Sequence, residues 1–209
     1  MARIYNEVAG KSLERLSALS DGVFSVALTL LVLDLHVPVR EAIHNEHDLW
    51  RAIVVLSPRL VPYLMTFMTV GIFWVGQQAQ LNFFERSNRD LAWIHIAFLL
   101  VITLTPFSTA LLAEFITYRL AVIIYWLNIL AAGVTLYWSW KYAVRAHLVK
   151  ESVPADLRAA VERRIVVAQA LYAMGVLLCA INTFWSIGFI VLVQLNYVLA
   201  PRIRVLYRI

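Results

Sequence analysis

Polar side chains interrupt an apolar stretch near the start of this 209-residue chain. Arg15, Ser20 and Asp21 open the run RLSALSDGVFSVALTLLVLDL, whose remaining residues are mainly apolar. Arg15 and Asp21 are six positions apart, so on a helix their directions differ by about 120°. They do not form a simple pair within one helix. An ionised carboxylate is costly in hydrocarbon, so Asp21 needs partners from other segments if this run crosses a membrane.

Later segments supply candidate partners at a matching depth. If the first helix rises from one membrane face, the second descends to that face and the third rises from it. Five further side chains then reach the level of Asp21, namely those of Trp74, Gln77, Gln78, Trp93 and His95. Of these, Trp74, Gln77, Gln78 and His95 join Arg15, Ser20 and Asp21 in a predicted polar cluster. Two roles remain open for it: a structural contact that holds three helices together, or a gating or proton-sensing site.

The remaining residue patterns do not indicate an enzyme. The apolar segments hold no nucleophile paired with a base, and the chain has no glycine-rich phosphate loop. Cys179 is the only cysteine, which excludes an intrachain disulfide and a cysteine-based metal site. His44 and His47 lie among carboxylates, where a solvated loop is a better interpretation than a zinc site. We therefore expect neither enzymatic activity nor a metal or cofactor.

Residues 69–73 read TVGIF and are close to TVGYG, the filter sequence of potassium channels. A carbonyl filter needs an extended backbone, whereas this stretch lies inside an uninterrupted apolar segment. Phe73 also replaces the last glycine of the filter. We predict a helix here, with Gly71 and Gly76 on a small-residue packing face.

Composition places these polar residues in an integral membrane protein. The chain is 62% hydrophobic and only 15% charged, whereas soluble domains average about 25% charged residues. The net charge of +5 comes from basic residues in connectors, so no nucleic-acid partner is expected. Apolar runs that match a bilayer core of about 30 Å predict an all-α fold with a single six-helix domain. The helices are expected at about 13–35, 58–80, 91–113, 118–141, 160–181 and 183–200 of the domain 1–209, with a tight hairpin at Asn182.

The Lys and Arg residues set the expected orientation of these helices. With the N-terminus inside, four of them fall in exterior segments: Arg40, Arg51, Arg59 and Arg119. Fourteen fall in interior segments: Arg3, Lys11, Arg15, Arg86, Arg89, Lys141, Arg145, Lys150, Arg158, Arg163, Arg164, Arg202, Arg204 and Arg208. This excess follows the positive-inside rule and predicts a multi-pass protein with both termini in the cytoplasm.

Three motifs give the chain a resemblance to a known family. RLSALSD, from Arg15 to Asp21, resembles the Arg-x-x-x-Phe-Ser-Asp signature on the first helix of the transmembrane protein 175 family. VGIFWVGQQ resembles the family's second-helix pattern of Val-Gly-x-Phe-Trp and a histidine pair, and TPFSTALLAEF resembles the end of its third helix. Leu19 replaces the phenylalanine of the signature. Gln77 and Gln78 replace the two histidines, which removes titratable groups from the cluster.

The resemblance implies a channel in which four six-helix subunits surround a central pore. The first helix would line that pore, and bulky apolar side chains would form its constriction. Counting from the Asp of the motif, the constriction residues are Val26, Leu30 and Leu33, and the polar residues lining the pore are Ser25 and Thr29. The residues alone leave another interpretation open. An apolar stripe such as Val26, Leu30 and Leu33 on a spanning helix usually contacts lipid or packs against another helix.

The expected function is passage of potassium and other monovalent cations through a hydrophobic constriction in a homotetramer. One six-helix unit per chain implies a bacterial inner-membrane protein, since eukaryotic members of the family carry two units. A secondary transporter or proton-coupled carrier with Asp21 as its relay is the alternative. Passive cation flux without a coupled ion would separate the two functions.

Overall fold

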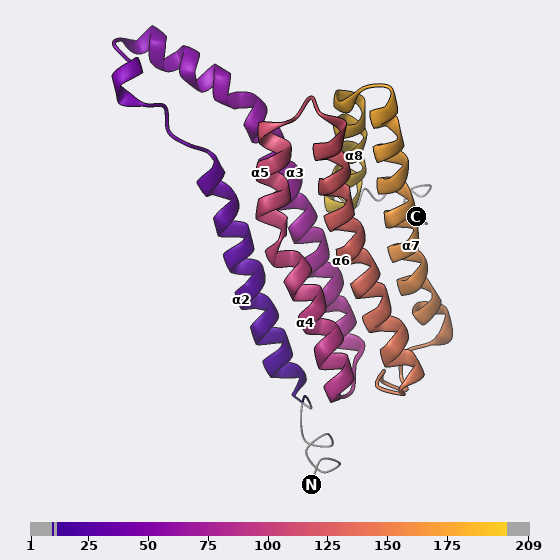
Figure 1. The fold of residues 1–209 in the computed structure, drawn as a ribbon. Helices are drawn as coiled ribbons and strands as arrows, with labels where there is room; N and C mark the ends of the chain where they lie inside the picture. The colour runs from indigo at the N-terminus through magenta and orange to yellow at the C-terminus, as the bar shows by residue number, and fades with distance from the viewer. Residues whose placement is uncertain (1–9, 11, 200–209) are drawn as a thin grey trace.

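Long helices that run up and down a common direction form the body of the protein (Figure 1). The structure is a computed structural model and describes residues 10 and 12–199. Its α-helices are α2 (Leu13–Leu31), α3 (Glu46–Phe83), α4 (Arg89–Thr103), α5 (Thr105–Glu114), α6 (Arg119–Arg145), α7 (Ala155–Leu177) and α8 (Thr183–Leu199). Among the described residues, five helical segments are long and apolar enough to cross a membrane, and the shorter α8 is also apolar. The protein is therefore an all-helical, multi-pass membrane protein.

The first helix, α2, begins at Leu13, as the sequence predicts. Ser12 caps it, because its side chain accepts a hydrogen bond from Arg15 N at 3.2 Å. Regular α-helix ends at Leu31, and a 3₁₀ turn at Val32–Asp34 continues the apolar segment to nearly its predicted end.

The second helix is longer than predicted. It begins at Glu46 rather than at Pro58, and both Pro58 and Pro62 lie inside it. Pro58 has no N–H to donate to Val54 O, and the Ser57 hydroxyl donates to that carbonyl instead, at 2.7 Å. The side chain thus replaces the missing backbone hydrogen bond, and the helix continues. Its first part extends beyond the rest of the bundle (Figure 1).

The third predicted helix, 91–113, is divided in the structure. α4 ends at Thr103 and α5 begins at Thr105, with Leu104 between them. Pro106 lies in the first turn of α5 and explains the break. A proline ring clashes with the carbonyl four residues earlier and donates no backbone hydrogen bond.

The last three helices follow the predicted order, but their ends differ. α6 continues past residue 141 to Arg145, and α7 begins at Ala155 rather than at residue 160. A 3₁₀ turn at Leu178–Ala180 follows α7, and the connection to α8 lies at Asn182, where the hairpin is predicted. Asn182 Oδ1 accepts a hydrogen bond from Phe184 N at 2.7 Å, which satisfies a free N–H at the start of α8.

Two buried apolar clusters hold the helices together. The larger one includes Phe24 of α2, Phe98 of α4 and Tyr125 of α6. The second lies at the end of the bundle where α2 begins, and Trp140 of α6 stacks there on Phe84 at 6.0 Å between ring centroids. Because both clusters include residues of α2, the first helix is packed against the bundle along much of its length.

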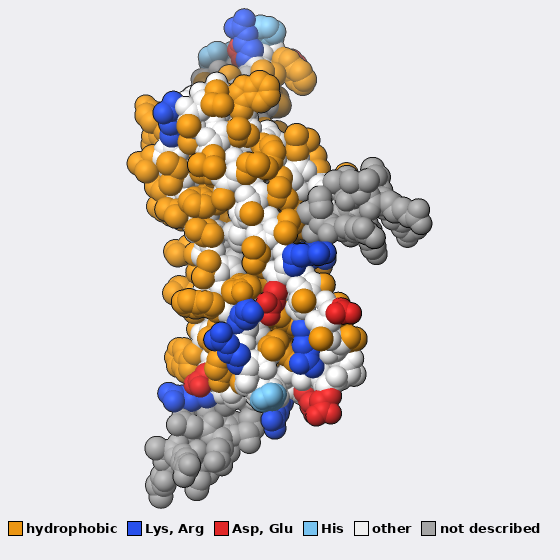
Figure 2. Space-filling view, turned by 90° about the vertical axis from the view of Figure 1, so that its right-hand side faces the viewer, with side chains coloured by type: hydrophobic (Ala, Val, Ile, Leu, Met, Phe, Trp, Pro, Cys, Tyr) orange, Lys and Arg blue, Asp and Glu red, His pale blue; other side chains and the backbone are white. Residues whose placement is uncertain are grey.

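The outer surface of the bundle is apolar over most of the face drawn in Figure 2. Lys, Arg, Asp and Glu side chains gather toward its lower end, which suits a protein whose middle contacts lipid (Figure 2). Five of the basic residues in the orientation count lie outside the described residues: Arg3, Lys11, Arg202, Arg204 and Arg208.

Candidate functional site

Helix α2 lies at one side of the bundle and has two different faces (Figure 1). Its buried face carries residues that repeat every three or four positions: Leu16, Ser20, Phe24, Ala27 and Leu31. On an exposed side of α2, Val26 is 57% exposed and Leu30 is 43% exposed, and Leu33, in the 3₁₀ turn that continues α2, is 65% exposed. All three predicted constriction residues are therefore exposed in the single chain, on what we call the outward face of α2 and its terminal turn.

Two hydroxyl-bearing residues, Ser25 and Thr29, are also exposed on α2. The Thr29 hydroxyl lies 2.9 Å from Val26 O and 3.1 Å from Ser25 O, so it donates its proton to its own helix. Its oxygen remains able to accept a hydrogen bond. The Ser25 hydroxyl has no hydrogen-bond partner among the described residues.

A shallow groove of about 440 Å³ follows this outward face. Leu19, Gly22, Val26 and Leu30 line it from α2, and Thr103 lines it from the end of α4. Gly22 leaves space in its floor, because a Cβ at this position would have no neighbour within 4 Å. The groove can therefore receive side chains from another protein segment.

A buried polar contact joins α2 to α3 and α4 behind this face. Ser20 is 0% exposed, Gln77 is 1% exposed and His95 is 2% exposed. Gln77 Nε2 donates to Ser20 Oγ at 2.9 Å and lies 2.8 Å from His95 Nε2. With the Gln77 amide in this orientation its N–H donates and His95 Nε2 accepts, while Gln77 Oε1 has no hydrogen-bond partner among the described residues. Ser20 Oγ lies 2.8 Å from His95 Nε2 and 2.8 Å from Leu16 O, the backbone acceptor for its own proton.

A second polar contact involves the next residue of α2. Asp21 Oδ1 accepts hydrogen bonds from Trp74 Nε1 at 2.9 Å and from Gln78 Nε2 at 2.7 Å. Gln78 Nε2 also lies 3.5 Å from Ser17 Oγ. The Asp21 carboxylate is exposed, and the two donors from α3 stabilise its charge. Asp21 thus lies at the surface of the single chain.

The residues of the predicted cluster therefore form two groups, one buried (Ser20, Gln77, His95) and one exposed (Asp21, Trp74, Gln78). Successive residues on a helix differ in direction by about 100°, which is why Ser20 and Asp21 belong to different groups. Arg15 belongs to neither group, and its side chain makes no hydrogen bond or ion pair with the described residues.

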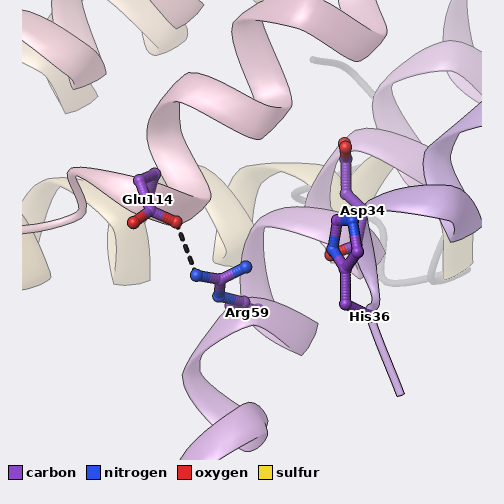
Figure 3. Close-up of polar contacts among 4 residues, drawn as sticks. All are labelled: Asp34, His36, Arg59 and Glu114. Atoms are coloured by element: carbon purple, nitrogen blue, oxygen red, sulfur yellow. Dashed lines mark hydrogen bonds and ion pairs between the residues drawn. The ribbon is translucent and has the colours of Figure 1, made fainter. Parts of the chain in front are cut away.

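Charged residues also occur at the opposite end of the bundle (Figure 3). Arg59 of α3 forms an ion pair with Glu114, the last residue of α5. Both side chains are more than one-third exposed, at 37% and 55%, so water limits this pair to about 0–1 kcal/mol. His36 Nδ1 donates to the backbone oxygen of Asp34 at 3.1 Å. Two carboxylates, Asp34 and Glu114, thus lie at the end where the exterior connectors are predicted.

Sequence reasoning missed a buried hydroxyl network in the middle of the bundle. Thr66 Oγ1 of α3 lies 2.8 Å from Thr109 Oγ1 of α5 and 3.3 Å from Tyr125 OH of α6. Thr69 Oγ1 lies 3.1 Å from Tyr125 OH and accepts from Gln194 Nε2 of α8 at 2.6 Å. Such contacts replace water as hydrogen-bond partners inside a membrane protein. The sequence signal was a pair of threonines three positions apart in an apolar segment.

The two other sites considered from the sequence have simple structural outcomes. Residues 69–73 lie inside the continuous helix α3, so this stretch does not form an extended carbonyl filter. Within residues 12–199, no three His, Cys, Asp or Glu side chains are grouped as a metal site requires.

Comparisons with known proteins find similarity in the region of this chain that carries the three motifs. The family model described as endosomal/lysosomal potassium channel TMEM175 matches residues 15–106, so its match begins at the first residue of the RLSALSD motif. A protein named potassium channel from Streptomyces collinus is 30% identical over 192 residues, which cover 90% of this chain and 84% of that protein. Another protein named potassium channel, from Chamaesiphon minutus, is 28% identical over 178 residues. The alignment covers 83% of this chain and 87% of that protein.

A solved structure has the same arrangement of helices. It is described as the crystal structure of a lysosomal potassium-selective channel TMEM175 homolog from Chamaesiphon minutus. The two structures superpose with a TM-score of 0.79 at 25% identity, and the alignment covers 91% of this chain and 98% of the other. The motifs, the extent of the sequence match and the shared fold all lead to one assignment: this chain belongs to the TMEM175 family.

Proposed function

We propose that this protein is the subunit of a potassium-permeable channel in a bacterial inner membrane, and that four copies surround one pore. In this proposal α2 lines the pore, Val26, Leu30 and Leu33 form the constriction, and Ser25 and Thr29 are polar lining residues. Relatives that match most of this chain are named potassium channels. The charge bias of the connectors supports an orientation with both termini in the cytoplasm.

The observation that carries the proposal is the outward face of α2. Its three apolar side chains are exposed in the single chain although they belong to a segment that the family model matches. The same helix exposes two hydroxyls, one of them without a partner among the described residues. Lipid chains offer no hydrogen bonds to such groups, whereas water does, and a permeating cation can be coordinated by the hydroxyl oxygens.

The chemistry of the outward face explains how a constriction of this kind works. Four leucine side chains around one axis make a narrow apolar neck that water leaves readily, so the closed state is a dewetted one. A small outward shift or rotation of α2 readmits water and ions. A cation in the neck sheds part of its hydration shell, which favours potassium over sodium because potassium holds water less tightly. Leucine has no oxygen ligand, so the preference it creates is modest.

The two polar contacts behind the pore face have a supporting role in this mechanism. The buried group of Ser20, Gln77 and His95 ties α2 to two neighbouring helices and fixes the rotation of α2 about its axis. The exposed Asp21 lies beside the pore face, next to Gly22 of the groove. We propose that these contacts set which residues face the pore, and that the constriction residues themselves control the flow of ions.

Ion flux through the purified protein in liposomes tests the proposal. We expect potassium to run down its gradient without a coupled sodium or proton gradient, whereas a carrier would require one. Leu30→Ala should raise the conductance and lower the preference for potassium over sodium. Leu192→Ala is a matched control, because Leu192 lies on α8 and is 66% exposed. If Leu30→Ala leaves selectivity and conductance as they are, the constriction lies elsewhere.

A further inference from the structure

Helix α2 presents two unlike flanks to the outside of the single chain. On one flank Asp21 accepts a hydrogen bond from Trp74 Nε1 of α3. On the other flank the groove described above passes Leu19 and Val23 and is also lined by Thr103 of α4. Leu19 and Val23 are each two positions from Asp21 in the sequence, which is about 200° around a helix. The groove and the Asp21 contact therefore lie on opposite sides of α2.

Trp74 is a large exposed side chain that is held in one orientation. Its indole nitrogen lies 2.9 Å from Asp21 Oδ1, and yet Trp74 is 41% exposed. Tryptophan often anchors protein interfaces, because it fills a pocket with a large and rigid apolar surface. A ring that is already oriented by a hydrogen bond loses little conformational freedom when it docks. The α3 flank thus offers a preformed apolar projection.

The groove on the other flank is suited to receive such a ring. It has a volume of about 440 Å³, and at one end it is lined by Ala18, Leu19, Gly22 and Val23. These side chains are all apolar, and Gly22 has none. A Cβ at Gly22 would meet no atom within 4 Å, so a side chain from outside can approach the backbone of α2 closely here.

The Trp74 ring and this end of the groove lie at the same depth along α2. Leu19 and Val23 are each about 3 Å from Asp21 along the helix axis, and Trp74 is bonded to Asp21. Rotation about the membrane normal changes the direction of a side chain but not its depth, so only features of equal depth meet between copies in a ring. A contact between two unlike patches closes into a ring when the rotation allows it.

The charge of Asp21 argues against lipid as the neighbour of the α3 flank. Asp21 lies eight positions after Leu13, the first residue of α2, which is about 12 Å along the helix. Its carboxylate is exposed in the single chain, and an ionised carboxylate at such a depth is costly in hydrocarbon. A second copy of the chain that covers this flank removes lipid from it.

We infer that Trp74 of one copy docks into the groove of the next copy around the pore. The ring packs on Leu19, Gly22 and Val23 of that copy, and its N–H stays bonded to Asp21 of its own chain. Val26 lies one turn further along the groove and Leu30 lies two turns further, so both remain available for the constriction. This inference rests on the four-copy pore proposed above and assigns the residues that join its subunits.

Photocrosslinking of the full chain in liposomes tests the contact directly. Benzoylphenylalanine, a photoreactive aromatic amino acid, takes the place of Trp74, and mass spectrometry of the cross-linked peptides identifies its neighbour. We expect a covalent dimer in which position 74 is joined to residues 18–26 of a second copy. The control carries the same amino acid in place of Trp138, an exposed tryptophan of α6, and should give no such dimer. A dimer joined through another helix overturns the inference.

Two substitutions test the fit from either side. Trp74→Ala removes the ring, and Gly22→Leu fills the groove at a position where its own chain leaves space. We expect each to raise about tenfold the protein concentration at which half of the protein is tetrameric in detergent. Trp138→Ala and Gly188→Leu are the matched controls and should leave this concentration unchanged. Gly188 lies on α8, and a Cβ there also has no neighbour within 4 Å.

The outcomes separate this inference from the proposed function. If folded Gly22→Leu and Trp74→Ala form tetramers as stable as those of the unmodified chain, the inference is overturned while a potassium flux through the unmodified chain leaves the proposed function standing. Equal losses in Trp138→Ala and Gly188→Leu overturn it as well, because the loss then does not come from this contact. A monomeric unmodified chain overturns both. The melting temperature of each variant reports whether its subunit is folded.

Discussion

Replacing each of two serines on α2 by alanine should separate the contribution of this helix to stability from its proposed role in the pore. Ser20 is buried and bonded to Gln77, whereas Ser25 is exposed on the outward face. The chemical change is the same, and both positions lie in the same helix. We expect Ser20→Ala to destabilise the protein with little effect on ion selectivity. We expect Ser25→Ala to change selectivity or conductance with little effect on stability.

The size of the Ser20→Ala effect follows from the contacts of its hydroxyl. The substitution leaves one N–H of Gln77 without its acceptor at a site that is 1% exposed. A buried unpaired donor costs about 1–3 kcal/mol, although single hydrogen bonds between membrane helices average about 0.6 kcal/mol. Alanine also favours the helix by up to about 0.7 kcal/mol. We therefore expect a net loss of about 1 kcal/mol for Ser20→Ala, and a change close to zero or slightly stabilising for Ser25→Ala.

Reversible unfolding of the purified variants measures the first quantity, and potassium and sodium flux into liposomes measures the second. His95 Nε2 keeps its hydrogen bond from Gln77 in Ser20→Ala, so the three helices should stay in contact. Equal destabilisation by the two substitutions would refute our reasoning that burial of the Ser20 hydroxyl decides the loss of stability. An altered ion preference in Ser20→Ala at unchanged stability would refute the supporting role that we assign to the buried contact.

Two further predictions concern the exposed carboxylate and the packing of α7. Asp21→Asn keeps an oxygen that accepts from both α3 donors, so we expect a loss below about 1 kcal/mol and unchanged flux; a changed response of the flux to pH would instead indicate proton sensing. Gly175→Ala places a Cβ 2.9 Å from Ile190 Cγ1, and such overpacking should outweigh the helix-propensity gain by about 1 kcal/mol in unfolding experiments. Gly71→Ala is its control, because a Cβ there has no neighbour within 4 Å and should be neutral or stabilising.

The order of the helices could be predicted from the sequence because a bilayer fixes the length of each apolar run. Proline was the main source of error in the helix ends. Pro58 was expected to begin a helix, yet the Ser57 hydroxyl satisfies the carbonyl that proline leaves free, and the helix runs through it. Pro106 breaks a helix that hydropathy alone makes continuous. A local hydrogen bond decides between these outcomes, and hydropathy does not report it.

The depth of a residue in the membrane was also predictable, but the side of the helix on which its side chain lies was less so. Alternating helix directions indicated that Gln77 and His95 lie near the level of Ser20, and the structure brings them together. The pairing of Arg59 with Glu114 was not predicted. Topology gives each residue a height, whereas a contact also requires that two helices face each other. That second condition depends on how the whole bundle packs.

The contrast between the two faces of α2 favours a pore over plain lipid contact. On the buried face the Ser20 hydroxyl donates to Leu16 O and accepts from Gln77 of α3, so this hydroxyl has partners. The outward face leaves the Ser25 hydroxyl without a partner in the described chain, one turn below Thr29. A helix that only faced lipid would gain nothing from hydroxyls there and would lose hydrogen bonds to water. Apolar residues that narrow a passage, with hydroxyls beside them that meet water, account for both features at once.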